Sequence, residues 1–269
     1  MLRRAVWGDQ FYPGQPRELA RQIETFLTAG PGEKIPAPVG CLAPHAGYMY
    51  SGAVAGAVYA RLELPDRVIL LGPNHSGLGE PLSILTEGSW QTPLGNAPID
   101  SGLAGELRRR CPLLAEDAEA HREEHSIEVQ LPFLQKLQPA MRFVPIAVGT
   151  ESFEALETLG QALAGTIRAA GRPVLIVASS DMNHYDNDER TRLQDRRAID
   201  QLLALDARGL YETVRRERIS MCGYCPAVTM MTAALELGAA RAELVRYATS
   251  ADASGDRSRV VGYAGIVVW

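Results

Sequence analysis

The sequence predicts a single α/β domain spanning residues 1–269, with a mainly parallel sheet flanked by helices. Continuous apolar runs such as residues 67–72 and 173–178 are typical of strands that are covered on both faces. Helical patterns separate these runs, and this alternation indicates βαβ units. With 269 residues, of which 46% are hydrophobic, the chain can bury a sizeable core without disulfide support.

The predicted helices have apolar side chains at helical spacing. In residues 15–29, for example, Leu19 and Ile23 lie on one face. Pro16 suits the first turn of this helix, and Gly30 suits its end. Similar patterns, or runs of small residues that allow close packing, predict further helices over residues 51–62, 101–110, 125–137, 152–170, 188–205 and 226–237.

The predicted strands are short apolar runs that lie between turn signals. Most are nearly continuous in hydrophobicity, as expected for strands buried inside an α/β domain. A weaker pattern around Gly88 predicts a hairpin formed by residues 82–86 and 88–92. The remaining strands are predicted at residues 38–43, 67–72, 142–149, 173–178, 242–248 and 260–268.

Charge and hydropathy exclude several classes of function. The net charge of −5 gives no basic footprint for a nucleic acid or an anionic membrane. No apolar run approaches the ~20 residues of a membrane span, and the first residues lack the apolar segment of a secretory signal. Four cysteines do not make a disulfide framework in a chain of this length. We therefore expect a cytoplasmic protein with reduced thiols.

Three of the five histidines follow predicted strands. His45, His75 and His184 come shortly after the strands 38–43, 67–72 and 173–178. Because parallel strands end at one edge of a sheet, where ligands bind, these side chains are predicted to share a site.

Asp181 precedes His184 by three residues on the same predicted loop. The aspartate and the histidine suit a ligand and a proton acceptor, or an orienting group and a base. The alternative is that Asp181 only caps a turn or a helix.

The segment His121 to His125 matches the H-x-x-E-H pattern of some zinc peptidases, with Glu124 as the group that activates water. Such a peptidase needs a further carboxylate ligand, which the sequence does not identify. In the alternative interpretation, His125 opens an amphipathic helix and faces the cleft of the other histidines, while His121 lies on the preceding loop.

Cys222 and Cys225 form a C-x-x-C pattern before a predicted helix. This arrangement occurs in thiol redox sites, because a helix N-terminus lowers the pKa of the first thiol. It could also be half of a zinc site, or Cys222 could add a single thiolate to the histidine site. Buried, inert thiols are the remaining alternative, and we expect this for Cys41 and Cys111.

Ordered motifs along nearly the whole chain resemble those of the Memo family, also called AmmeMemoRadiSam system protein B. The fold of this family is similar to that of the class III extradiol dioxygenases, which are non-haem iron enzymes. The motifs are AVWGDQFYPG, PHAGYMYSG, LLGPNHSG, WQTPLG at residues 90–95, EEHSIEVQLPFL, SSDMNHY, CGYCP and GYAGIVV.

The resemblance implies a metal site formed by His45, His75 and Cys222. Fe(II) is the expected metal, with copper or zinc as alternatives. A thiolate in place of the usual carboxylate is softer and can be oxidised, which puts extradiol ring cleavage in doubt. A disulfide between Cys222 and Cys225 would disable such a site.

The resemblance also implies that further side chains line the same cleft. Asp181, His184 and His125 are the candidate catalytic residues, and His184 falls where the dioxygenases are expected to keep an acid/base histidine. The family name further implies a radical-SAM protein and a small companion protein as partners.

Three functions follow from these observations. The first is a redox enzyme that uses non-haem iron or copper on an unknown small or peptide substrate. The second is a non-catalytic scaffold that binds a peptide or small ligand in the same cleft. The third is a zinc peptidase built on His121, Glu124 and His125.

Overall fold

Four parallel strands form the centre of the main sheet in the computed structural model, which describes residues 1–28 and 32–269. They are hydrogen-bonded in the order β2, β9, β3, β8. Nearly all of their residues are buried, as their continuous apolar sequences predict. The bounds of these strands are β2 (Gly40–Ala43), β3 (Arg67–Pro73), β8 (Arg142–Val148) and β9 (Leu175–Ser179).

The flanks of this sheet are antiparallel where they join the centre. On one side β12 (Val260–Val268) runs antiparallel to β2, to β11 (Ala242–Thr249) and to β10 (His184–Asp186). On the other side β4 (Leu82–Ile84) runs antiparallel to β8; β7 (Ala115–Glu116) in turn pairs with β4 in parallel. The α/β class is confirmed and the sheet is mixed. The connection between β11 and β12 is too short for the crossover that parallel strands need.

The hairpin predicted around Gly88 is wrong. Its first arm is β4 of the main sheet, whereas its second arm, β5 (Ser89–Thr92), lies in a small sheet with β1 (Leu2–Arg3) and β6 (Gly95–Pro98). Gly88 has φ +109°, and a Cβ there would lie 2.1 Å from the carbonyl oxygen of Met1. The first residues of the chain, far away in sequence, therefore displace the predicted pairing.

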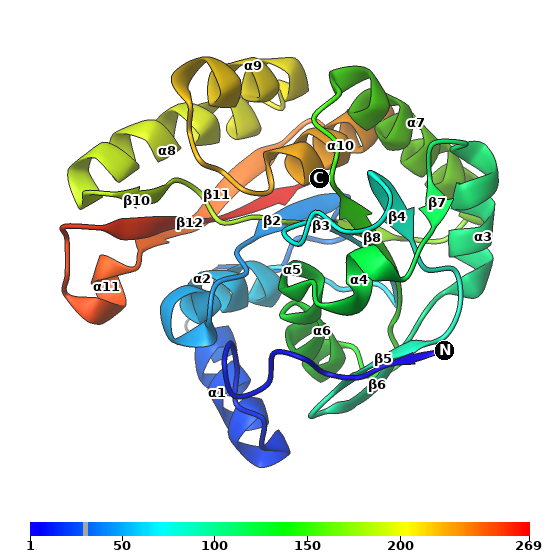
Figure 1. Cartoon of the computed structure of the whole chain (residues 1–269), viewed down its shortest axis with the longest axis horizontal. Coiled ribbons are helices and arrows are strands. Elements are labelled where there is room, and N and C mark those ends of the chain that lie inside the picture. The colour runs from blue at the N-terminus through cyan, green and yellow to red at the C-terminus, as the bar shows by residue number, and fades with distance from the viewer. Residues whose placement is uncertain (29–31) are drawn as a thin grey trace.

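Helices cover both faces of the main sheet (Figure 1), with α1, α2 and α6 on one side and α7 to α10 on the other. A large hydrophobic cluster joins sheet and helices. In the part of the chain that the structure describes, no helix combines the length and the hydrophobicity that a membrane crossing requires. The longer helices are α1 (Pro16–Thr28), α2 (Tyr48–Ala60), α3 (Ser101–Arg110), α6 (Leu131–Leu137), α7 (Phe153–Ala170), α8 (Asp188–Leu203), α9 (Ala207–Glu217) and α10 (Tyr224–Glu236); the four-residue ones are α4 (Glu119–Arg122), α5 (His125–Glu128) and α11 (Ala251–Ser254).

Most predicted helices agree with the structure to within a few residues. The predicted helix 125–137 is split into α5 and α6, because Pro132 lacks an N–H and its ring crowds the preceding turn. Helix α9 was not predicted. The predicted end of the first helix at Gly30 lies outside the described residues.

Candidate metal centre

A cleft of about 600 Å³ opens at the carboxyl ends of the central strands. His45 follows β2, His75 follows β3, and His184 follows the loop that leaves β9. The cleft brings together all six predicted site residues from distant parts of the sequence. Its lining consists of Phe11, His45, Ala46, Gly47, His75, His125, Asp181, His184, Tyr185, Ser220, Cys222 and Val261.

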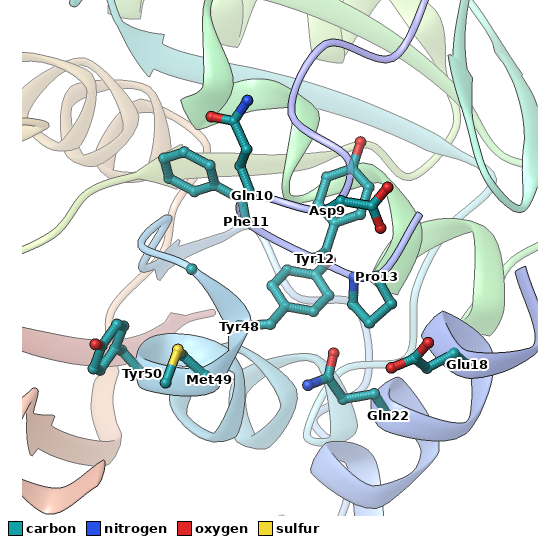
Figure 2. A pocket seen from close by; sticks show the side chains of 11 residues that line it. Asp9, Gln10, Phe11, Tyr12, Pro13, Glu18, Gln22, Tyr48, Met49 and Tyr50 are labelled. Atoms are coloured by element: carbon teal, nitrogen blue, oxygen red, sulfur yellow. The ribbon is translucent and has the colours of Figure 1, made fainter. Parts of the chain in front are cut away.

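A second cavity of about 390 Å³ adjoins this cleft (Figure 2). Phe11 and Gly47 line both spaces. The acidic side chains of Asp9 and Glu18 and the ring of Tyr50 also line the second cavity. A ligand that fills the cleft therefore has room beside it for an additional group.

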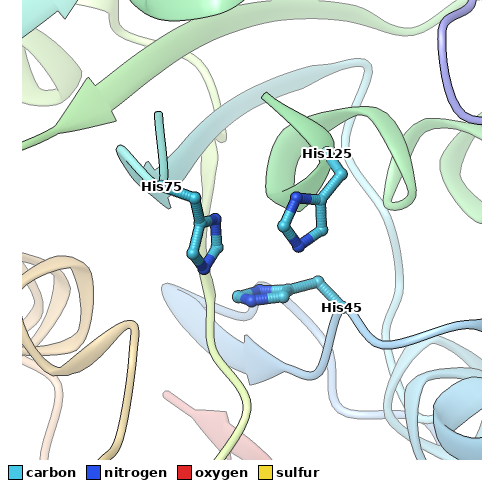
Figure 3. Close-up of side chains that lie close together, drawn as sticks. All are labelled: His45, His75 and His125. Atoms are coloured by element: carbon cyan, nitrogen blue, oxygen red, sulfur yellow. The ribbon is translucent and has the colours of Figure 1, made fainter. Parts of the chain in front are cut away.

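Three imidazole rings converge in the cleft (Figure 3). One ring nitrogen each of His45, His75 and His125 lies within 4.8 Å of the other two. The rings of His75 and His125 stack with their centroids 4.4 Å apart, and His45 meets both edge-on. The family resemblance implies that His125 is a catalytic candidate, whereas in the structure it is the third member of this cluster.

The tautomer of His45 is set by the hydroxyl of Ser179. That hydroxyl donates its only hydrogen to the carbonyl oxygen of Ser126, at 2.7 Å. It must therefore accept the hydrogen bond from Nδ1 of His45, at 2.9 Å. Gln130 donates to the same hydroxyl oxygen at 2.8 Å and helps to fix it. His45 consequently presents the lone pair of Nε2.

Glu124 sets the tautomer of His75. Its fully buried carboxylate accepts from Nδ1 of His75 at 2.8 Å and from the backbone N–H of His75 at 2.7 Å. It also caps α5 by accepting from the backbone N–H of Ser126. Burial alone would raise the pKa of Glu124, but the hydrogen bond and charge interaction with His75 outweigh it and hold the pKa at about 2. The carboxylate is therefore ionised, and His75 presents Nε2.

Two imidazoles of the cluster are held neutral. Burial lowers the pKa of His45 well below its usual value, and the nearby His75 lowers it further. Burial, together with His45 and His75, lowers the pKa of His125 to about 3. Neutral imidazoles have the lone pairs that metal binding requires, so at neutral pH His45 and His125 need no proton release to act as donors.

Cys222 lies on the His45 side of the cluster. Its Sγ is 3.2 Å from Nε2 of His45 and 3.3 Å from the backbone nitrogen of Asp181. Burial raises the pKa of this thiol, so the S–H group donates to the free lone pair of His45. Cys225 lies buried in the first turn of α10, and both cysteines are free thiols.

Asp181 and His184 are anchored separately. Oδ1 of Asp181 accepts from the backbone N–H groups of His45 and Ala46, at 2.8 and 3.2 Å. Nδ1 of His184 is 2.8 Å from the carbonyl oxygen of Ser220, which can only accept. His184 therefore has its proton on Nδ1 and a lone pair on Nε2, and a carbonyl group rather than Asp181 sets this tautomer.

The N-terminal segment forms a wall of the cleft. The rings of Phe11 and Trp7 pack against His125 at centroid distances of 4.7 and 5.6 Å. Buried Glu128 holds this segment in place. It forms an ion pair with Arg3 at 2.5 Å and accepts hydrogen bonds from the backbone N–H of Trp7 and from the hydroxyl of Tyr12. In the sequence, only an aromatic motif far from the other site residues points to this role.

His121 lies apart from the cleft. Its side chain is buried beside Trp90, with ring centroids 5.8 Å apart, and neither ring nitrogen has a hydrogen-bond partner among the described residues. His121 belongs to α4 and His125 to α5, while Glu124 binds His75. The H-x-x-E-H pattern therefore does not assemble into a peptidase metal site.

The donors present fit a transition-metal ion. Imidazole suits iron, copper and zinc, and three convergent imidazoles leave further coordination positions open. Among the described residues, the structure brings the donor atoms of His45, His75 and His125 within 4.8 Å of one another, whereas Cys222 contacts only His45 of this cluster, so the set of His45, His75 and Cys222 that the resemblance implies stays a prediction. Glu124 and Ser179 supply the outer hydrogen bonds that ligating histidines usually have.

Nearly the whole chain is similar to known proteins. The family model described as "Memo-like protein" matches residues 3–267. A MEMO1 family protein of Methanopyrus kandleri is 42% identical over 279 residues, covering 99% of both chains. A MEMO1 family protein of Methanothermobacter thermautotrophicus is 40% identical and covers 98% of this chain and 99% of its own.

A solved structure shares the fold. The crystal structure of an uncharacterized protein from Escherichia coli K12 has a TM-score of 0.59 and 14% sequence identity, covering 85% of this chain and 98% of that chain. This likeness concerns the fold alone, whereas the family match spans nearly all of the sequence. The chain therefore belongs to the Memo-like protein family.

Proposed function

We propose that the protein binds one Fe(II) ion at His45, His75 and a third ligand, and acts as a dioxygenase-like redox enzyme on an unknown substrate. The observation that carries this proposal is the cluster of three imidazoles with ring nitrogens within 4.8 Å of one another. The third ligand is His125 or Cys222. Copper and zinc are the alternative metals, because a thiolate ligand would favour softer ions than iron.

In this proposal, the metal and the residues of the cleft would have separate roles. Bound iron would supply oxygen activation and Lewis acidity. His184, with its free Nε2, would accept a proton from the substrate and return it. Asp181 would hold the backbone that carries His45. Phe11 would exclude water from one side of the cleft.

The dimensions of the site indicate the size of the substrate. A cleft of about 600 Å³ suits a small organic molecule or the end of a peptide. The adjoining cavity of about 390 Å³ offers room for a second group. We place the protein in the cytoplasm, where a reducing environment would keep the Cys222 thiol available.

Metal analysis tests this proposal. Protein without an affinity tag is purified anaerobically without chelators, and its metal content is measured by elemental analysis. We expect about one equivalent of metal, which His45→Ala and His75→Ala abolish. His125→Ala and Cys222→Ala then decide the third ligand, because only one of them should lose the metal. His121→Ala is the control and should retain it.

A contradiction would be full metal content in His75→Ala, or no binding under any loading condition. Oxygen consumption by the iron-loaded protein then separates a redox enzyme from a metal-binding protein without turnover. Zinc binding that is lost in His121→Ala would revive the peptidase hypothesis.

The alternative is a non-catalytic scaffold that binds a peptide or other ligand in the same cleft. Two adjoining cavities that share Phe11 and Gly47 favour an extended ligand. Ligand binding that is unaffected by metal removal would support this function. A radical-SAM protein and its small companion protein stay predicted partners, and co-purification from cells tests them.

A further inference from the structure

A buried carboxylate lies beneath the loop that carries His184. Asp195 belongs to α8 and is fully buried. One of its oxygens accepts from the backbone N–H of Asn183 at 2.8 Å, and the other accepts from the hydroxyl of Tyr247 at 2.6 Å. Within residues 1–28 and 32–269, it forms no ion pair. Burying a carboxylate without an ion pair costs free energy. A structural or functional role of Asp195 would account for this cost.

Strand β12 packs beside α8 and has a glycine, Gly262, where it faces this carboxylate. A Cβ atom on Gly262 would lie 1.8 Å from Oδ2 of Asp195, so no other residue fits at this position without displacing the carboxylate. The backbone of Gly262 also holds the loop. It donates to the carbonyl oxygen of Asn183 at 2.9 Å and accepts from the N–H of Met182 at 2.8 Å. Both Gly262 and the Asp195 carboxylate therefore hold the backbone of Asn183, and Gly262 also holds that of Met182.

A chain of hydrogen bonds continues from Asn183 to the cleft. The side-chain oxygen of Asn183 accepts from the backbone N–H and the hydroxyl of Ser220, at 3.1 and 2.9 Å. The Ser220 hydroxyl accepts from the backbone N–H of His184 at 2.7 Å. The Ser220 carbonyl accepts from Nδ1 of the same histidine at 2.8 Å. Each donor and acceptor in this chain has one consistent role.

We propose that Asp195 is a positioning residue for His184, acting through Asn183 and Ser220. It fixes the loop so that the Ser220 carbonyl holds the proton on Nδ1 and Nε2 remains the free acceptor in the cleft. This inference rests on the proposed acid/base function of His184. Without Asp195 the buried N–H of Asn183 has no acceptor, and the loop moves to satisfy it.

The tautomer of His184 is the readout. In metal-free protein with ¹⁵N-labelled histidine, two-bond nitrogen–proton correlations show which nitrogen carries the proton. The chain has only five histidines, and His184→Gln assigns the signal. We expect the Nδ1–H form in the wild type. In Asp195→Ala we expect the ratio of Nδ1–H to Nε2–H to fall about fivefold or more, because one hydrogen bond is worth ~1 kcal/mol.

Conservative and control variants separate positioning from general stability. Asp195→Asn retains an oxygen for the N–H of Asn183 and should restore the wild-type ratio. Asp100→Ala is the matched control. Asp100 is also buried, caps the distant helix α3 and accepts a hydrogen bond from the backbone N–H of Leu103 in that helix. Asp100→Ala should lower the free energy of unfolding and leave the tautomer of His184 unchanged.

A wild-type tautomer ratio in folded Asp195→Ala would overturn the proposal, as would an equal shift in Asp100→Ala. If Asp195→Ala does not fold, Ser220→Ala at an exposed position tests the same chain, and a wild-type ratio there would also overturn it. Because no metal is present in this experiment, its outcome is independent of whether the histidine cluster binds one. Failure of this inference and failure of the proposed function are therefore distinguishable.

Discussion

Replacing Glu124 with glutamine removes one negative charge and changes the shape of the side chain very little. In the wild type, one carboxylate oxygen accepts from Nδ1 of His75 and from the backbone N–H of Ser126, and the other accepts from the backbone N–H of His75. Glutamine has a single oxygen, so its amide group must face one set of these donors.

Both orientations of the glutamine are unfavourable. If its oxygen retains Nδ1 of His75, the amide NH₂ meets a backbone N–H at the position where the wild-type distance is 2.7 Å. If the amide is turned over, Nδ1 must give up its proton, and the proton on Nε2 then blocks the metal. Each orientation loses at least one hydrogen bond to a charged acceptor, worth ~1.5–3 kcal/mol.

We therefore expect Glu124→Gln to weaken metal binding by about 10–100-fold, which is typical for loss of an outer hydrogen-bond partner. Anaerobic competition with a chromophoric chelator measures this affinity. Glu123→Gln is the control, because the neighbouring Glu123 side chain is 63% exposed and should not matter. Equal affinities of Glu124→Gln and wild type, or an equal loss in Glu123→Gln, would refute the reasoning.

Three further predictions concern stability, oxidation and pH. Arg3→Met leaves the buried Glu128 unpaired and should lower the free energy of unfolding by ~3–5 kcal/mol in urea denaturation. Oxidation should weaken metal binding if Cys222 is a ligand, so affinity measured with and without reductant should differ, and Cys225→Ser then separates disulfide formation from direct oxidation. Burial raises the pKa of Asp195 to about 7, despite hydrogen bonds from Tyr247 and Asn183 that lower it. The unfolded chain releases this proton near pH ~4 and the folded chain near 7, so stability should fall by about 4 kcal/mol as pH rises across that window. Asp195→Asn should lose that part of the pH dependence, and an unchanged slope would contradict the assignment.

The central part of the fold could be predicted because its strands are buried on both faces. Continuous apolar runs such as 67–72 need no tertiary information to be recognised as strands. The pairing of residues 88–92 could not be predicted, because it depends on the N-terminal residues that cross Gly88. The break near Pro132 was visible in the sequence, but its apolar periodicity favoured one long helix.

The candidate site could be predicted for a similar reason. Parallel strands end at one edge, so histidines that follow three such strands meet there, as His45 and His75 do. The groups that set the tautomers could not be predicted, because Ser179 is an ordinary polar residue in the sequence and the H-x-x-E-H pattern suggested a different role for Glu124. The identity of the third member also depends on packing, which brings His125 onto His75.

The most direct test of the metal site is anomalous diffraction from crystals of protein loaded with Fe(II) under anaerobic conditions. We predict one anomalous peak in the cleft, within ~2.0–2.2 Å of Nε2 of both His45 and His75 when zinc distances are used as a guide. A third ligand, from His125 or Cys222, should lie at bonding distance. A cleft without such a peak at full metal loading, or a peak bound by neither His45 nor His75, would contradict the proposed metal centre.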